Sequence, residues 1–291
     1  MIFWLLVLFF GFHKPVLAEE MVKLSPAITE VIIEEKDNQK EIEYWLENYS
    51  EDDLSYKLKL VDFEGLNETV GVAFIGLSKN QVERKYGLAS WMSVSSDQIV
   101  VPAKSKTKFK VLISNKESLS PGGHYAGVIL ESNQQNEKDL GFKQVFSSLI
   151  LLKKRGGEIV SWKLKDLNFK NNYWEIPSEV LINFQNSGNV HVVPRGKIEI
   201  TDSFGRVVAN GLINRESGFV LPETIKTVKT EIVRNKKIVM IGKMKMVINY
   251  RIEDEESWQK IEKNWWYVDG KILLFLFLIP IVLLIIKPKK H

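Results

Sequence analysis

Glu41-Ile-Glu-Tyr-Trp-Leu-Glu47 places an apolar side chain at every second position, with glutamates and one tryptophan between them. Successive side chains of a β-strand point to opposite faces, so this alternation predicts a strand with one buried and one solvated face. The same period of two recurs at Lys57-Leu-Lys-Leu60 and at Lys108-Phe-Lys-Val-Leu-Ile113. Antiparallel sheets that face water on one side have this pattern, and the chain is therefore predicted to be all-β.

The strand pattern falls into two series, with Lys153-Lys-Arg-Gly-Gly157 between them. Turn signals such as Pro121-Gly-Gly123 divide the first series, and about seven short strands with this spacing fit an immunoglobulin-like sandwich. The run Val180-Leu-Ile-Asn-Phe-Gln185 belongs to the second series. The sequence therefore predicts two tandem immunoglobulin-like β-sandwich domains, over residues 19–155 and 156–252.

Residues 272–286 form an apolar run that is followed at once by a cluster of lysines. This pattern predicts one C-terminal transmembrane helix over residues 271–286, with a basic cytoplasmic tail over 287–291. A buried helix of a soluble protein fits the length of the run but not its apolarity on every face. Residues 253–270 are predicted to be a charged and aromatic juxtamembrane stalk. The residues expected to anchor the chain at the two membrane surfaces are Trp265, Trp266, Tyr267, Lys271, Lys287, Lys289 and Lys290.

The first residues of the chain indicate export. An apolar run over residues 2–10 is followed by Val16-Leu-Ala18, which is small enough at its first and third positions to be a signal-peptidase site. A signal peptide over residues 1–18 is therefore predicted. The positive charge that usually precedes the apolar run is missing, so an uncleaved N-terminal anchor is the alternative. With cleavage, the chain is expected to be a single-pass protein of the cell membrane, with an extracellular ectodomain and a cytoplasmic C-terminus.

Charge and cysteine content exclude several classes of protein. Without Lys14 and the four anchor lysines, the formal net charge falls by five, from +4 to −1. A nearly neutral ectodomain has no global electrostatic reason to bind nucleic acid. The chain has no cysteine, which excludes disulfides and thiolate metal sites.

Sequence motifs for catalysis are absent. There is no His-Glu-x-x-His, no Gly-x-Ser-x-Gly and no phosphate-binding glycine loop. Of the four histidines, His124 and His191 remain in the ectodomain, and each follows a turn signal where a polar or packing role is expected. We therefore expect no enzyme activity, no cofactor and no metal site.

Two local motifs carry further expectations. Asn48-Tyr-Ser50 and Asn67-Glu-Thr69 match the N-glycosylation sequon, a motif that is common by chance. Pro121 fixes its own φ near −65°, and Gly122 is expected at the positive φ that the third position of a type II turn needs. Replacing Gly122 with Val is therefore expected to cost about 1–3 kcal/mol, and Gly123→Ala less.

A family resemblance lies in the segments Leu24-Ser-Pro-Ala-Ile28, Trp91 to Ile99-Val-Val-Pro102, and Pro121-Gly-Gly-His-Tyr-Ala-Gly127. Together they resemble the N-terminal module of WxL-interacting bacterial cell-surface proteins. The resemblance implies a signal peptide, a first immunoglobulin-like module that binds peptidoglycan, a second module that contacts host or partner proteins, and a C-terminal helix with a Lys-rich tail. In the second domain it rests on position and on Asn186-Ser-Gly-Asn-Val-His191. The chain also resembles periplasmic pilus chaperones, which are likewise two tandem sandwiches.

The sequence therefore favours a non-enzymatic, membrane-anchored bacterial surface protein that binds the peptidoglycan of the cell wall or other surface and host proteins. The alternatives are a pilus-chaperone-like assembly factor and a carbohydrate-processing enzyme that uses Asp/Glu pairs. Exposed strand edges or loops are expected to make the contact, because a sheet edge offers unpaired backbone groups. The candidate ligand-binding residues are aromatic and polar side chains on charged stretches and at the Pro-Gly-Gly turn: Trp45, His124, Tyr125, Tyr173 and Trp174.

Overall fold

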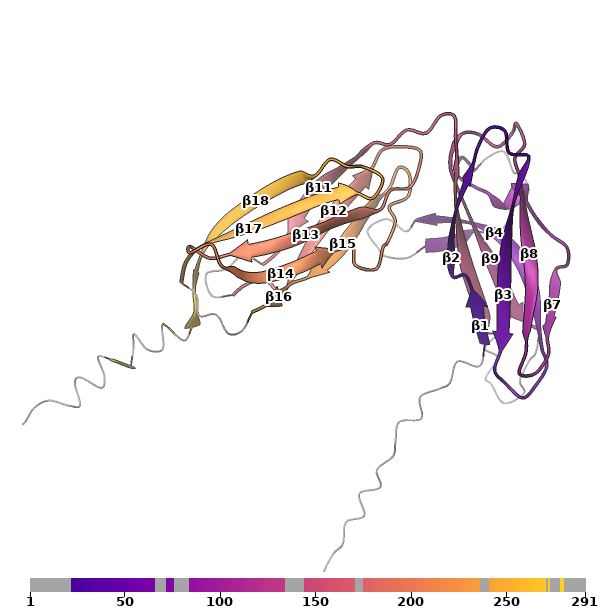
Figure 1. The fold of residues 1–291 in the computed structure, drawn as a ribbon, viewed down its shortest axis with the longest axis horizontal. Coiled ribbons are helices and arrows are strands. Elements are labelled where there is room, and N and C mark those ends of the chain that lie inside the picture. The colour runs from indigo at the N-terminus through magenta and orange to yellow at the C-terminus, as the bar shows by residue number, and fades with distance from the viewer. Residues whose placement is uncertain are drawn as a thin grey trace, which may run out of the picture.

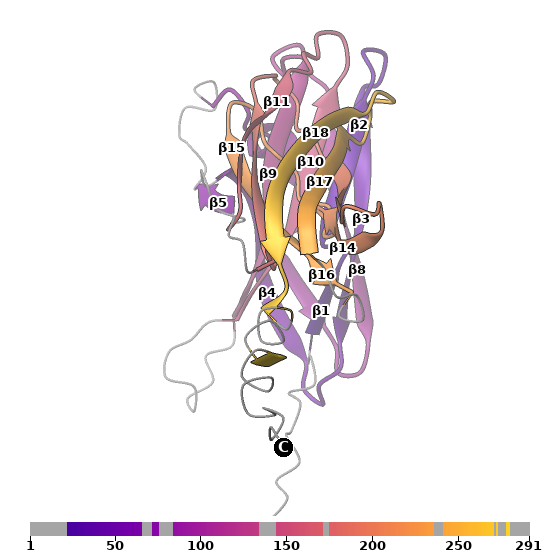
Figure 2. The same cartoon turned by 90° about the vertical axis from the view of Figure 1, so that its left-hand side faces the viewer.

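The computed structural model describes an all-β chain, as predicted. It covers residues 22–65, 72–75, 84–133, 144–170, 175–235, 241–270, 272 and 278–279. The described strands form four sheets, two built from residues 22–154 and two from residues 162–268. We call these parts the N-terminal half and the C-terminal half. Figure 1 shows the N-terminal sheets upright and the C-terminal sheets extending sideways from their upper end, and Figure 2 shows the same arrangement from the side.

The two sheets of the N-terminal half face each other as a sandwich. The first has the strand order β1-β3-β8-β6, and the second has the order β2-β10-β9-β4-β5, with β7 also paired to β4. The short 3-10 helix η2 (Ala89–Trp91) precedes β6. The strands are β1 (Val22–Ser25), β2 (Ile28–Ile33), β3 (Gln39–Asn48), β4 (Leu54–Gly65), β5 (Val72–Ile75), β6 (Met92–Val94), β7 (Gln98–Val101), β8 (Lys106–Ser114), β9 (Gly122–Ser132) and β10 (Val145–Lys154).

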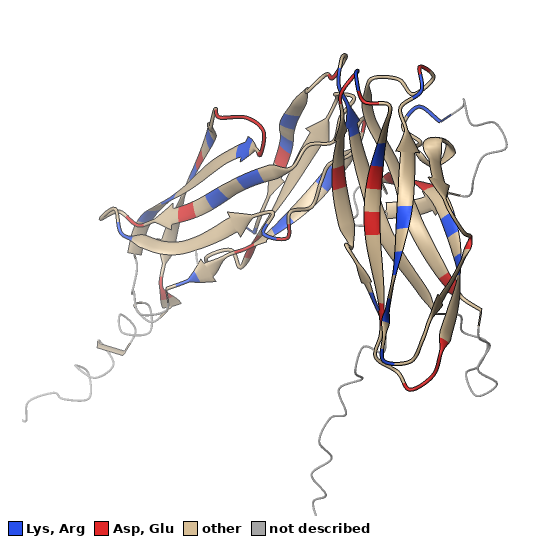
Figure 3. Cartoon of the chain, turned by 45° about the vertical axis from the view of Figure 1, so that its right-hand side comes forward, with Lys and Arg blue, Asp and Glu red and all other residues tan. Residues whose placement is uncertain are grey.

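The alternating stretch that opens this account forms β3, in the middle of the first sheet. Ile42, Tyr44 and Leu46 are buried in the N-terminal core. The glutamates between them lie on the outer face, where Glu41 is 2.6 Å from Lys110 and Glu43 pairs with Lys108 on β8. The same outer face is visible as rows of red and blue in Figure 3. In β3, the alternation of apolar and polar residues therefore predicted correctly which side chains are buried and which face solvent.

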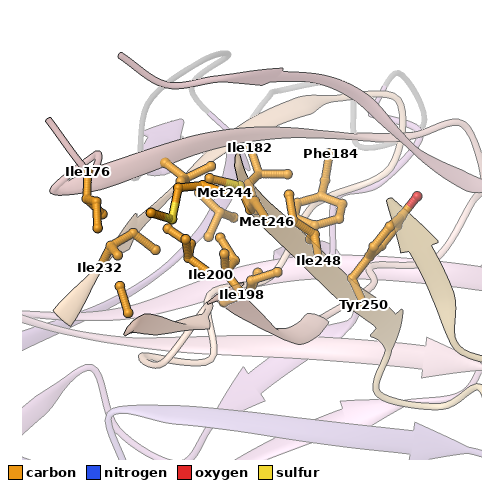
Figure 4. Packing of buried hydrophobic residues seen from close by; sticks show 14 of the residues in the cluster. Ile176, Ile182, Phe184, Ile198, Ile200, Ile232, Met244, Met246, Ile248 and Tyr250 are labelled. Carbon is orange, nitrogen blue, oxygen red and sulfur yellow. The ribbon is translucent and has the colours of Figure 1, made fainter. Parts of the chain in front are cut away.

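The C-terminal half has the same layered plan. Its sheets have the orders β11-β12-β15 and β16-β14-β13-β17-β18. Ile198 and Ile200 of one sheet pack with Met246 and Ile248 against Phe184 of the other, as Figure 4 shows. The strands are β11 (Trp162–Asn168), β12 (Glu179–Asn186), β13 (Pro194–Thr201), β14 (Val207–Ile213), β15 (Ile225–Glu231), β16 (Val233–Arg234), β17 (Ile241–Ile252) and β18 (Gln259–Val268).

The predicted juxtamembrane stalk over residues 253–270 is not what the structure shows. Most of it is β18, which pairs antiparallel with β17 from Tyr250↔Gln259 to Ile241↔Val268. Trp265 and Tyr267 are buried in the C-terminal core, whereas Trp266 between them is 62% exposed. The reason lies in the alternation of side chains along a strand, which places Ile261, Trp265 and Tyr267 on one face, packed against the C-terminal core. The aromatic residues beside the apolar run 272–286 had instead indicated a membrane interface.

The chain crosses from the first sheet to the second between β1 and β2. β1 pairs with β3 in the first sheet, and β2 pairs with β10 in the second. Pro26, which has no backbone N–H, lies at the crossing. The crossing leaves β2 as the end strand of its sheet.

Candidate functional site

One edge of the N-terminal half combines open backbone groups with exposed apolar side chains. β2 pairs with β10 in parallel, from Ile28↔Leu149 to Ile33↔Lys154, and has no second strand partner among the strands that the structure describes. The carbonyls of Ala27 and Ile33 accept hydrogen bonds from Leu149 and Arg155, each at 2.9 Å. Along a strand, the backbone N–H and C=O groups of successive residues point alternately toward one neighbouring strand and toward the opposite side. Positions 27, 29, 31 and 33 thus face β10, and positions 28, 30 and 32 face away.

The side chains at the outward positions are Ile28, Glu30 and Ile32. We call these three residues the β2 edge. Ile28 is 53% exposed and Ile32 is 45% exposed. Natural sheets usually protect such an edge with charges, because unpaired backbone beside apolar side chains invites another strand. On β2 the single charge is Glu30, at the centre.

Two other free edges carry repeated lysines. β11 ends the three-stranded sheet of the C-terminal half, and its exposed side chains include Lys163 and Lys165. β18 ends the five-stranded sheet, with Lys260 and Lys263 exposed. Repeated lysines along an edge discourage pairing with another chain. Unlike these two edges, the β2 edge has no lysine, and its one charge is Glu30.

The C-terminal half docks on the face of the second sheet beside the β2 edge. Phe63, Tyr125 and Leu151 from that sheet form a buried cluster with Leu221 from the C-terminal half. The Gly123 amide donates a 2.7 Å hydrogen bond to the Asn189 carbonyl across the same junction. The contact therefore combines apolar burial with a backbone hydrogen bond, and it places the C-terminal half next to β2.

Glu30 faces this junction. Its carboxylate lies 3.7 Å from Nε2 of His191, which is too long for a hydrogen bond, and the two groups form an ion pair only when the ring is protonated. The His191 side chain is fully buried, and burial lowers the pKa of its ring, so the ring is neutral at pH 7. The hydroxyl of Tyr125 lies 3.3 Å from Nδ1 of the same ring. The pKa of Glu30 is lowered from its ordinary value of 4.5, first by the facing His191 side chain and further by the charge of Lys153, so the carboxylate is ionised at pH 7.

A second carboxylate lies in the same corner. The Lys153 ammonium on β10 donates a 2.8 Å hydrogen bond to Asp254, and this bond is the main cause of the lowered pKa of Asp254. Lys153 is only 16% exposed, whereas Asp254 is 72% exposed and Glu30 57%. Two ionised carboxylates therefore share the corner with one covered ammonium and a neutral imidazole. The two most exposed of these groups beside the β2 edge, Glu30 and Asp254, are carboxylates.

The structure does not bring the predicted ligand-binding residues together. Trp45 is half-buried on the outer face of the first sheet, where the ammonium groups of Lys106 and Lys108 lie 4.6 and 5.4 Å from its ring centre. His124 and Tyr125 are buried, at 2% and 1% exposure. Tyr173 and Trp174 lie outside the described residues.

The ring of His124 makes two close contacts with backbone carbonyls. Nδ1 lies 3.0 Å from the oxygen of Gly87, and Nε2 lies 2.8 Å from the oxygen of Ser120. These contacts hold the start of β9 against the loop before η2. The structure thus gives His124 a structural role, and it places Tyr125 at the junction between the halves.

The predicted membrane-anchor residues have different positions. Trp265 and Tyr267 belong to the C-terminal core, and Trp266 is exposed. Lys271, Lys287, Lys289 and Lys290 lie outside the described residues, as do the predicted signal peptide 1–18 and nearly all of 271–286. In the part of the chain that the structure describes, no helix is both long and apolar enough to cross a membrane.

Sequence reasoning missed the β2 edge. The segment Ile28-Thr-Glu-Val-Ile-Ile33 has the composition of an ordinary strand, with Pro26 just before it. Only the strand order shows that this strand ends its sheet and that positions 28, 30 and 32 face outward. The proline is a weak signal, because prolines favour the start of edge strands.

Similar folds occur among solved structures. A class 5 fimbriae chaperone, CfaA, has a TM-score of 0.43 and 11% identity, and the match covers 83% of this chain and 98% of that chain. The Pseudomonas aeruginosa chaperone CupB2 has a TM-score of 0.39 and 10% identity, with 81% and 96% covered. The YadV chaperone has a TM-score of 0.38 and 11% identity, with 84% and 100% covered. No family model and no curated protein sequence matches the chain.

These comparisons correct two predictions. The three similar structures named above are chaperones, and the prediction of a membrane-anchored surface protein that binds the cell wall is withdrawn. The single-pass membrane location is withdrawn on the same finding. What stands from the sequence is the all-β, immunoglobulin-like sandwich fold. The resemblance to WxL-interacting proteins stays a prediction.

Proposed function

We propose that this protein is a non-enzymatic assembly factor that holds an extended segment of a partner protein by adding it as a strand to the β2 edge. The observation that carries the proposal is that the backbone N–H and C=O groups of Ile28, Glu30 and Ile32 point away from β10, and that the side chains of both isoleucines are exposed. Strand addition to an open sheet edge is a general mode of peptide recognition, in which the main chain provides affinity and the side chains provide selectivity. This role corresponds to the chaperone-like alternative from the sequence.

Backbone hydrogen bonds provide the first contribution. Each outward residue of β2 offers one N–H and one C=O, and a strand laid alongside would satisfy them. Each such bond stabilises a complex by about 0.5–1.5 kcal/mol net of the water it replaces. These bonds do not depend on the partner's side chains, so they suit a protein that handles extended segments.

Apolar contacts provide the second contribution. Ile28 and Ile32 lie on the same face of β2, on either side of Glu30. An added strand would cover much of the exposed surface of both side chains, at about 25 cal/mol for each Å² of apolar area removed from water. The neighbouring C-terminal half closes one side of the corner and limits how a segment can lie.

The enzyme alternative finds no support in the two carboxylates beside the edge. A glycosidase needs one carboxyl group with a raised pKa, so that it can donate a proton at neutral pH. The pKa values of Glu30 and Asp254 are both lowered, by His191 and Lys153 respectively. Both groups are therefore ionised and cannot act as the general acid.

The proposal is tested by blocking the outward N–H of one edge residue. Proline has no N–H, and at Ile32 it removes a group that faces away from β10, so the pairing of β2 with β10 stays intact. The probe is a fluorescently labelled peptide, Ser-Thr-Val-Thr-Gln-Thr-Val-Thr-Ser, titrated with the full chain. We expect Ile32→Pro to abolish binding and the control Ile32→Thr, which keeps the N–H, to retain most of it. Unchanged binding by Ile32→Pro, or no binding by the unmodified chain at millimolar peptide, would overturn the proposal.

A further inference from the structure

The β2 edge carries a pattern of side chains that specifies its partner. Resting on the proposed strand addition, we propose that the edge selects an extended segment with a lysine or arginine flanked, two positions away on each side, by apolar residues. The partner is thus a protein segment of the form apolar-x-basic-x-apolar. Three observations support this pattern: the alternation along β2, the charge of the corner, and the poor fit of a second copy of the same edge.

Geometry sets the spacing. Side chains of neighbouring strands that lie on the same face and directly opposite each other are about 4.5–5.5 Å apart at Cβ. If one residue of the added strand lies opposite Glu30, the residues two positions before and two positions after it lie opposite Ile28 and Ile32. Since Ile-Glu-Ile at these positions reads the same in both directions, the pattern holds for a parallel and for an antiparallel partner strand.

Charge sets the central residue. The Glu30 carboxylate is 57% exposed and has only a neutral, buried imidazole facing it at 3.7 Å. The neighbouring ammonium of Lys153 is already hydrogen bonded to Asp254. The corner therefore presents an accessible carboxylate at Glu30 whose nearest cation is already engaged. A cation placed opposite Glu30 gains a favourable cross-strand pair, and an anion there is repelled.

A second copy of this chain is a poor occupant. Antiparallel pairing of two β2 edges that brings Ile28 opposite Ile32 also brings Glu30 opposite Glu30. Like charges directly opposite each other destabilise a strand pair. The same glutamate that attracts a basic segment thus opposes self-association, which is a common use of edge charges.

The test compares three peptides that differ only at the centre: Ser-Thr-Val-Thr-Lys-Thr-Val-Thr-Ser and the same peptide with Gln or Glu in place of Lys. With the full chain, we expect the Glu peptide to bind roughly fivefold to thirtyfold more weakly than the Lys peptide, with the Gln peptide between them. In Glu30→Lys the order should reverse. The control is Glu51→Lys, which changes the net charge equally at a side chain that is 84% exposed and belongs to the loop after β3.

The outcomes separate this inference from the proposed function. Equal binding of the three peptides, or an unreversed order in Glu30→Lys, overturns the basic preference. If Ile32→Pro still abolishes binding of the Gln peptide in that case, strand addition stands without it. If Ile32→Pro leaves binding of all three peptides unchanged, strand addition itself fails.

Discussion

Glu30 of the edge strand β2 and His191 of the C-terminal half lie 3.7 Å apart, carboxylate oxygen to Nε2. The two residues are far apart in the sequence: Glu30 lies on β2, and His191 lies in the loop between β12 and β13. Their contact means that the open edge and the junction between the halves share one electrostatic environment. Binding at the edge and the stability of the junction are therefore expected to respond to the same titrating groups, which are Glu30, His191 and Asp254.

Acid should weaken the folded state through His191. Burial lowers the pKa of its ring below the ordinary value of 6.5. Just below pH 6.5, the ring is therefore protonated in the unfolded chain but still neutral in the folded chain. This contribution to stability is fully present above pH 6.5 and is lost as the pH falls from 6.5 through the lower pKa of the folded-state ring. His124 is also buried with a lowered pKa and acts with the same sign.

This prediction is checked by urea unfolding of the full chain from about pH 7.5 down to about pH 5, a range above the titration of most carboxyl groups. His191→Gln cannot titrate, and it should lose less stability over this range than the unmodified chain. His124→Gln serves as the matched comparison at the second buried ring. A slope that is the same in the unmodified chain and in both variants would contradict the assignment.

At the start of β9, substitution of Gly123 should destabilise the fold more than the sequence predicted. Gly122 has φ +117°, which confirms the predicted positive φ. A Cβ at Gly123 would lie 2.2 Å from the buried Tyr125 hydroxyl and 3.1 Å from the Asn189 carbonyl oxygen. We therefore expect Gly123→Ala to cost about 1–3 kcal/mol, since an added methyl group in a packed site displaces its neighbours.

That cost is measured by chemical denaturation beside Gly122→Ala and Gly270→Ala. A Cβ at Gly270 would meet nothing within 4 Å, so this variant is the neutral control. A Gly123→Ala protein as stable as the control would show that the junction is not packed as described.

Removing the charge of Glu30 should turn the β2 edge toward self-association. In Glu30→Val the like-charge repulsion between two β2 edges disappears and a third apolar residue joins Ile28 and Ile32. Sedimentation velocity should show a concentration-dependent dimer for this variant. The matched control is Glu43→Val on β3, an inner strand with partners on both sides. A monomeric Glu30→Val protein at the highest soluble concentration would argue against an accessible edge.

Two adjacent tryptophans should differ sharply in their contribution to stability. Trp265 is 7% exposed in the C-terminal core, and Trp266 is 62% exposed. Trp265→Ala should cost about 3–5 kcal/mol, as is usual for large aromatic residues of a core. Trp266→Ala, the neighbouring surface change, should stay within about 0.5 kcal/mol. Equal effects of the two substitutions in thermal or urea unfolding would contradict the register of β18.

Local sequence was sufficient where a strand's two faces differ in polarity. The glutamates of β3 alternate with its buried apolar residues, and the structure places them accordingly. β18 follows the same rule at Trp265 and Tyr267. Because these aromatic residues lie close to the apolar run 272–286, however, they were predicted to lie at a membrane surface. The sequence alone could not decide between a strand and a membrane interface, because the decision depends on β17 having a free side, opposite β13, on which β18 pairs.

Long-range contacts lay beyond sequence reasoning. Asn48 begins a glycosylation sequon, yet it is 2% exposed and its amide donates to the carbonyls of Val101 and Pro102, each at 3.1 Å. Asn186 ends β12 in a similar way, donating to Val190 and Val220. The acceptors on Val101, Pro102 and Val220 come from distant strands and loops, so no local motif distinguishes such an asparagine from an exposed one. The β2 edge was missed for the same reason, because an edge is a property of strand order.

The most direct test of strand addition at the β2 edge is amide hydrogen exchange in the full chain, measured residue by residue by NMR with and without the Lys-centred peptide. Ile28, Glu30 and Ile32 direct their N–H groups away from β10, so we predict slower exchange at these three positions in the complex. Val31 faces β10 and should change little. Bound peptide with unchanged exchange at all three outward positions would contradict the account.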